Sequence, residues 1–93
     1  MSVIDVNTIV ARAEHVFWHC IDDEAILLNI HSGMYYTLNT VGCDIWKTLD
    51  GKRDVRELGE ELCQHYTIDP QQAKQDLLAL FDELRQEDLV VTL

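Results

Sequence analysis

The pattern of apolar and polar positions divides the chain into a β-rich first half and a helical second half. Residues 16–21 and 24–30 are rich in β-branched and aromatic residues, and Asp22-Asp23 between them is a turn signal. A tight turn at residues 31–33 precedes a third β-rich segment, residues 34–38. The three segments predict a small antiparallel meander.

A first helix is expected immediately after the meander. Asn39 or Thr40 can cap it, the helix runs to about Leu49, and Gly51 ends it. Its apolar stripe consists of Val41, Ile45 and Leu49.

Two further helices follow, each with its own start signal. Asp54 and Glu57 form a capping box for the second helix, whose apolar stripe is Val55, Leu58, Leu62 and Tyr66. Asp69-Pro70 with Gln72 starts the third helix, which runs to about residue 86. Residues 89–91 add either a short strand or a packed tail. Residues 1–14 have mixed character and predict either a loose arm or an early strand.

The third helix has two apolar faces. A core stripe is expected from Ala73, Leu77, Leu80 and Leu84. A second stripe, to one side of the first, contains Lys74, Leu78, Phe81 and Arg85, while Gln72, Asp76 and Glu83 lie opposite it. A helix that only covers a core needs one apolar face, so the second stripe indicates another contact.

Composition and charge narrow the function classes. The 93 residues are 47% hydrophobic and 26% charged, as in a globular chain of one domain. The formal net charge of −10 disfavours nucleic acids and anionic membranes. No signal peptide or membrane span is expected, and three unevenly spaced cysteines match neither a disulfide framework nor a zinc site. We expect a cytoplasmic protein.

Catalytic and metal-binding patterns are weak. His15 and His19 have helical metal-ligand spacing, but they fall in a segment that predicts a strand, where this spacing separates them. No local signature accompanies any cysteine, and the glycines are scattered rather than gathered in a phosphate-binding loop. We therefore expect no catalytic residue, no metal and no cofactor.

The segment 34–38 favours peptide capture. Alternation places Met34, Tyr36 and Leu38 on one face of this strand, and Tyr35 and Thr37 on the other. In a chain this short, few elements are available to cover the edge of the sheet, and an open edge can pair with an added strand.

The order and spacing of many residues across roughly residues 16–91 resemble those of the PqqD-like family. The resemblance rests on Leu27-Leu28-Asn29, Ser32-Gly33, Tyr36, Leu38-Asn39-x-x-Gly42-x-x-Ile45-Trp46, Leu49-x-Gly51, Val55-x-x-Leu58, Leu62, Tyr66, the 76–84 helix and Leu89-Val90. It implies an α+β, winged-helix-like fold with a three-stranded antiparallel sheet followed by three helices, here an arm at residues 1–14 and a peptide-recognition domain at 15–93. Residues 31–33 read His-Ser-Gly instead of the Pro-Glu-Gly turn typical of PqqD proper. Trp46 and Tyr35-Tyr36 look more like recognition proteins of other clusters, including those for lasso peptides.

The resemblance also implies a function. Family members bind the leader of a ribosomally made precursor peptide as an added strand, between the third strand and the third helix. The implied peptide-binding residues are Met34, Tyr35, Tyr36, Thr37 and Leu38 opposite Lys74, Leu78, Phe81 and Arg85. Lys74 and Arg85 are then expected to attract acidic leader segments.

We therefore predict a non-catalytic adaptor that presents the precursor to a modifying enzyme or leader peptidase. Two alternatives stay open, an acidic winged-helix transcriptional regulator and a small enzyme subunit. A homodimer through the same strand edge is a further alternative.

Overall fold

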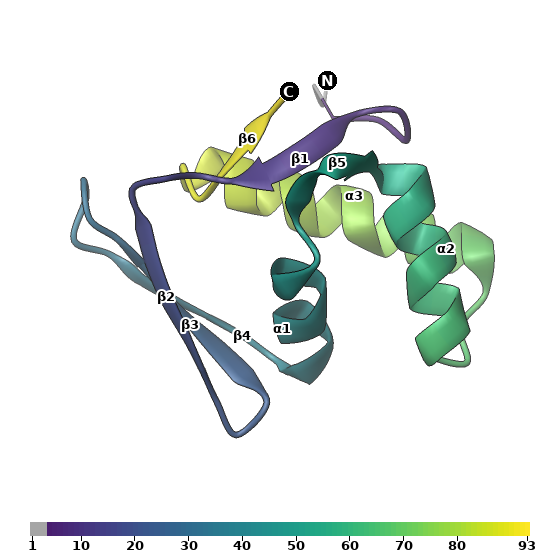
Figure 1. Ribbon diagram of the computed structural model, residues 1–93, viewed down its shortest axis with the longest axis horizontal. Helices are drawn as coiled ribbons and strands as arrows, with labels where there is room; N and C mark the ends of the chain where they lie inside the picture. The colour runs from purple at the N-terminus through teal and green to yellow at the C-terminus, as the bar shows by residue number, and fades with distance from the viewer. Residues whose placement is uncertain (1–3) are drawn as a thin grey trace.

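The computed structural model describes residues 4–93, and these form six short strands and three helices (Figure 1). Strands β2 (Val16–Ile21), β3 (Glu24–Asn29) and β4 (Tyr35–Leu38) make an antiparallel sheet in the order β2-β3-β4. This sheet is the predicted meander, and the α+β class is confirmed.

The turn between β2 and β3 explains why this hairpin forms. Asp22 and Asp23 both have a positive φ, 51° and 66°, and the flanking residues Ile21 and Glu24 pair directly. Two left-handed residues in a two-residue loop give the backbone twist that adjacent antiparallel strands require. Gly33, with a φ of 77°, serves the turn before β4.

A second antiparallel sheet was not predicted. Its central strand is β1 (Ile9–Arg12), which pairs with β5 (Asp50–Asp54) on one side and β6 (Val90–Thr92) on the other. The early-strand alternative for the N-terminal segment therefore applies, and residues 9–12 are part of the domain rather than an arm. Residues 1–3 lie outside the described part of the chain.

Helix α1 (Thr40–Lys47) is shorter than expected. Asn39 caps it by accepting a hydrogen bond from the Gly42 amide at 2.9 Å. The chain then enters β5, in which Gly51 has a φ of 76°, so this glycine lies in a strand instead of ending the helix. Val41 is 37% exposed, and the buried face of α1 is made of Gly42, Cys43, Ile45 and Trp46.

The remaining helices begin where their start signals predict. In α2 (Val55–His65), Asp54 and Glu57 form the expected reciprocal capping box. In α3 (Pro70–Gln86), the Asp69 carboxylate accepts hydrogen bonds from the Gln71 and Gln72 amides. The Gln72 side chain donates to Asp76 at 2.8 Å.

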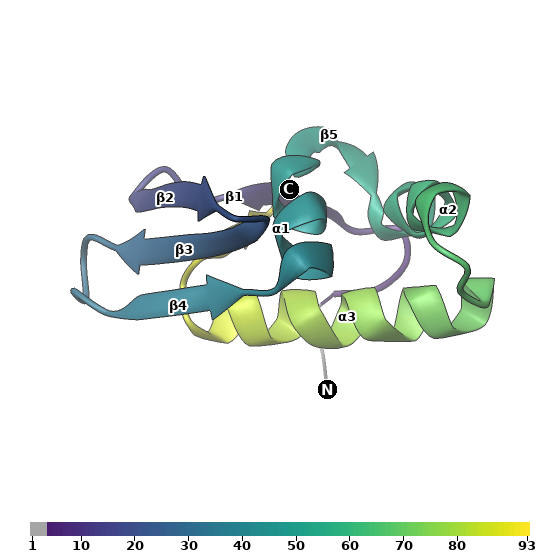
Figure 2. The same cartoon turned by 90° about the horizontal axis from the view of Figure 1, so that it is seen from below.

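The core lies between the two sheets and the three helices. Trp46 is fully buried in α1, and the Trp18 ring from β2 meets it edge-on at 6.2 Å between centroids. Seen from below, α3 passes under α1 and α2, and its C-terminal end comes up to β4, while the meander projects beyond it (Figure 2). None of the described helices has the length and hydrophobicity needed to cross a membrane.

Candidate functional site

Strand β4 has an open edge. In the sheet order β2-β3-β4 it pairs only with β3, and its far edge is directed toward α3 (Figure 2). The backbone N–H of Asn29 donates a hydrogen bond to the Met34 carbonyl, so this carbonyl faces β3. By the alternation of an antiparallel ladder, the backbone groups of Tyr35 and Thr37 point outward. The edge therefore presents unused hydrogen-bonding groups.

A groove of about 440 Å³ lies between β4, the start of α1 and α3. Its strand side and α1 side consist of Tyr36, Thr37, Leu38, Asn39, Val41, Gly42 and Ile45. Its other walls consist of Leu62, Ile68, Asp76, Leu80, Glu83, Leu84, Glu87 and Leu89. The groove thus combines an apolar interior with carboxylates on α3, next to an open strand edge.

The predicted strand residues divide between two surfaces. Tyr36, Thr37 and Leu38 line the groove. Met34 and Tyr35 are 55% and 67% exposed and are not among the lining residues.

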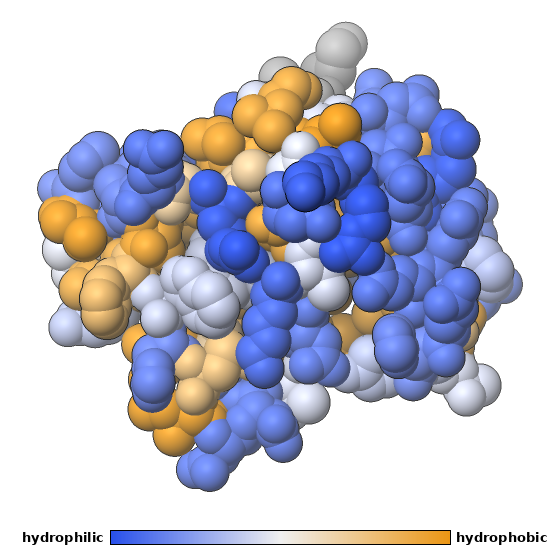
Figure 3. Space-filling model, viewed as in Figure 1, coloured by the Kyte–Doolittle hydropathy of each residue, from blue (hydrophilic) through white to orange (hydrophobic). Residues whose placement is uncertain are grey.

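Met34 and Tyr35 belong to a set of exposed apolar side chains on the meander, with Phe17, Ile21, Ile26 and Ile30. Figure 3 shows hydrophobic residues gathered over the meander, whereas the surface over α2 is mainly hydrophilic. Met34 and Tyr35 are therefore placed on an exposed surface, outside the groove.

The structure places the helix half of the predicted site outside this groove. Phe81 is fully buried in the core. Lys74 packs on α2, where its Cγ would lie 3.5 Å from a Cβ added at Gly59. Leu78 is half-buried against the core, and Arg85 has a buried Nε without a hydrogen-bond partner among the described residues. None of the four residues lines the groove.

This placement follows from how α3 is rotated about its axis. Its buried stripe is Ala73, Leu77, Phe81 and Leu84, so Phe81 occupies the core and Leu80 is only half-buried. The flank that faces β4 carries Asp76, Leu80, Glu83 and Glu87. This flank lies on the other side of the core stripe from the predicted one. In the sequence, the only sign of this flank was one leucine, Leu80, that shares a helix face with acidic residues.

One end of the groove is bridged. The Tyr36 hydroxyl donates a hydrogen bond to the Glu87 carboxylate, which joins β4 to the end of α3. This bond, followed by desolvation and the charge of Glu87, raises the pKa of the Tyr36 hydroxyl above its ordinary value. The neutral hydroxyl is thereby favoured at the groove.

Further contacts hold the end of α3 against the meander. Asn29 is buried, and its side-chain amide donates a hydrogen bond to the backbone carbonyl of Glu87 at 3.2 Å. His15 Nε2 lies 2.9 Å from an Asp88 carboxylate oxygen, and its ring stacks on His31 at 4.1 Å. His15, His31 and Asp88 each offer one atom that could bind a metal ion, and these three atoms lie within 4.8 Å of one another. These contacts link the end of α3 to the meander at this end of the groove.

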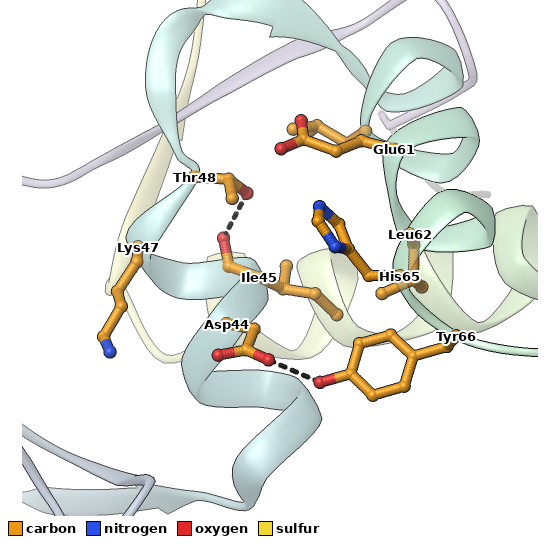
Figure 4. Close-up of a pocket in the computed structure, with 9 residues that line it drawn as sticks. Asp44, Ile45, Lys47, Thr48, Glu61, Leu62, His65 and Tyr66 are labelled. Atoms are coloured by element: carbon orange, nitrogen blue, oxygen red, sulfur yellow. Dashed lines mark hydrogen bonds between the residues drawn. The ribbon is translucent and has the colours of Figure 1, made fainter.

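A second hollow, of about 540 Å³, lies between α1 and α2. Figure 4 shows Glu61, His65 and Tyr66 reaching from the α2 side toward α1. The Tyr66 hydroxyl donates to the Asp44 carboxylate, which links the two sides. Ile45 and Leu62 line both hollows, so the second adjoins the groove.

None of the three cysteines lines either hollow. Cys43 is buried, and its sulfur is 2.8 Å from that of Cys20. Burial, with the Cys20 contact as the next cause, raises the pKa of the Cys43 thiol to about 11. A thiol with such a pKa is almost entirely protonated at neutral pH and is a poor nucleophile.

Comparison with known proteins identifies one matching family. The family model described as coenzyme PQQ synthesis protein D (PqqD) matches residues 24–90. A search of curated proteins finds no significant match.

Solved structures share the fold over most of the chain. The structure of TbiB1 in complex with the TbiA(beta) leader peptide matches with a TM-score of 0.80 and 29% identity, covering 86% of this chain and 93% of that one. A lasso peptide synthetase B1 complexed with the leader peptide has a TM-score of 0.80 and 20% identity, covering 89% and 98%.

A third match is the PqqD truncation of Methylobacterium extorquens PqqCD, described as a stand-alone recognition element for ribosomally synthesised and post-translationally modified peptides. It has a TM-score of 0.81 and 18% identity, covering 97% of this chain and 96% of that one. At this level of identity, the second and third matches establish the fold.

Proposed function

Since this chain belongs to the PqqD family, we propose that it binds the leader of a ribosomally synthesised precursor peptide. The leader adds a strand to the open edge of β4 and lies in the groove beside α3. The observation that carries this proposal is that the unused backbone groups of β4 open directly onto a groove. The similar structures of TbiB1 and of the lasso peptide synthetase B1, both solved with leader peptides, support it.

The groove can supply both affinity and selectivity. Main-chain hydrogen bonds to Tyr35 and Thr37 would hold an extended peptide irrespective of its side chains. Alternate side chains of an added strand point to the same face. One set would therefore enter the groove and contact Leu38 and Leu80.

The protein acts as an adaptor and performs no chemistry itself. It holds the leader so that the rest of the precursor reaches a modifying enzyme or a leader peptidase. In support, the buried Cys43 thiol is protonated at neutral pH and lies outside the groove. Its free thiols also suit the reducing cytoplasm, where precursor peptides are made.

An unbiased peptide selection tests the proposal. The purified protein is incubated with an mRNA-displayed library of random peptides, and enriched peptides are synthesised and added to isotope-labelled protein for amide exchange by NMR. We expect exchange to slow at Tyr35 and Thr37, whose amides are unpaired in the free protein. Exchange at Tyr36 and Leu38, which already face β3, should change less.

Three results would overturn the proposal. They are failure to enrich any peptide, binding without protection of the β4 edge, and a covalent change in the bound peptide. A dimer through this edge would give a different result. The Tyr35 and Thr37 amides would then exchange slowly without peptide, at protein concentrations where sedimentation shows a dimer, and the edge would be assigned to a second copy of the chain.

A further inference from the structure

The wall of the groove formed by α3 is acidic. Asp76, Glu83 and Glu87 line it, and no Lys, Arg or His is among the groove residues. In the described part of the chain, none of these three carboxylates pairs with a basic side chain. This is the reverse of the expected groove, in which Lys74 and Arg85 would have supplied positive charge.

The positions of two of these carboxylates are unfavourable for the helix itself. Glu83 and Glu87 are four residues apart at the end of α3, where like charges at this spacing repel one another. The C-terminal end of a helix also carries a partial negative charge that disfavours carboxylates. A cation placed between β4 and this end of α3 would relieve both repulsions.

The spacing of the carboxylates matches an extended peptide. Four residues of helix span about 6 Å along the axis. Two residues of a strand span roughly 6.6 Å, and their side chains point to the same face. The axes of β4 and α3 are nearly parallel in Figures 1 and 2, so successive same-face side chains of a strand added to β4 are spaced to meet Glu83 and Glu87 in turn.

We propose that the groove selects leaders that carry two basic residues two positions apart, and that Glu83 and Glu87 bind these residues. The inference rests on the proposed function and specifies its ligand as a basic segment rather than an acidic one. The apolar side chains of Leu80 and Leu84, which line the same groove, accommodate the aliphatic stems of Lys or Arg.

The peptide selection described above also tests this inference. Among peptides that protect the β4 edge, we expect enrichment of Lys or Arg at two positions separated by one residue. An enriched peptide and its analogue with both basic residues replaced by Gln are then titrated by fluorescence anisotropy. The analogue should bind about tenfold more weakly, and this difference should shrink at high salt.

Variants of the protein assign the effect to the two carboxylates. In the Glu83→Gln/Glu87→Gln variant, the basic peptide and its analogue should bind within about twofold of each other. Without the two carboxylates, the basic side chains of the peptide have no partner in the groove, and the comparison of both proteins with both peptides forms a double-mutant cycle. The matched control is Glu14→Gln/Glu60→Gln, which causes the same change in net charge at exposed positions outside the groove. The control should retain the full preference. Glu83→Gln alone keeps the bond between Tyr36 and Glu87 and should lose part of the preference.

The outcomes separate the two proposals. Peptides that protect the β4 edge without a basic preference, or a preference that survives in the double variant, would overturn this inference and leave the proposed function standing. Failure to bind any peptide at the edge would overturn both.

Discussion

The Tyr36 hydroxyl donates a hydrogen bond to the Glu87 carboxylate and so joins the edge strand β4 to the end of α3. The two residues are 51 positions apart in the chain. Both line the groove, so the bond spans one end of the proposed peptide site.

The bridge should break at alkaline pH. The pKa of Tyr36 is raised in the folded protein by its bond to Glu87, so the neutral hydroxyl contributes stability below the ordinary tyrosine pKa of 10.0 and loses it as pH rises beyond that value. The pKa of Tyr66 is raised in the same way by Asp44. In a spectrophotometric titration, Tyr36→Phe and Tyr66→Phe should each remove one late-ionising tyrosine. Loss of an early-ionising tyrosine instead would contradict the two hydrogen bonds.

Replacement of Thr37 by proline should block peptide binding while the fold survives. The Thr37 amide points to the open edge, so proline removes a donor from that edge and none from the ladder with β3. We expect at least about tenfold weaker binding of a selected peptide, and Thr37→Ala, which keeps the amide, should bind almost normally. Circular dichroism checks the fold. Equal binding by the proline variant would show that the peptide does not pair with β4.

A polar group placed at Leu80 should weaken binding. Leu80→Asn puts an uncharged amide into the apolar part of the groove, and we expect a loss of about 1.5 kcal/mol in binding free energy for a selected peptide. Gln75→Asn places the same amide at an exposed α3 position outside the groove and should have little effect. Titration calorimetry measures both. Equal losses would show that the peptide does not contact this flank of α3.

Phe81 should matter for stability rather than for contact with the peptide. The side chain is fully buried, so Phe81→Ala should lower the free energy of unfolding by about 3–5 kcal/mol through lost burial and a residual cavity. Chemical denaturation measures this change. If the Phe81→Ala protein keeps near-normal stability but binds the peptide much more weakly, Phe81 contacts the peptide and the assignment to the core is wrong.

Cys43 should be the least reactive of the three thiols. It is buried, and its pKa of about 11 leaves little thiolate at neutral pH. Alkylation with iodoacetamide followed by peptide mapping should label it last in the native protein, and this order should disappear in denaturant. Because this pKa is raised from 9.0, the contribution of the neutral thiol to stability should decline as pH rises from about 9 to about 11.

The meander and the starts of the helices could be predicted because their signals are local. Two aspartates in a left-handed turn set the hairpin of β2 and β3, and Asp54 and Asp69 cap the helices they precede. The sheet of β1, β5 and β6 could not be predicted in the same way. Its strands come from the beginning, the middle and the end of the chain, and β5 has the polar sequence DGKRD without an apolar alternation.

By itself, the sequence determined the meander, the three helices and an edge strand suited to peptide capture. It also determined that α3 has more than one distinctive flank. Helical periodicity defines which residues share a face, but not which neighbour that face will meet. Only the packing of α3 against the rest of the fold decided that Phe81 enters the core and that Leu80, Glu83 and Glu87 face β4. That rotation of the helix replaces a basic wall with an acidic one, because residues on either side of one buried stripe carry opposite charges.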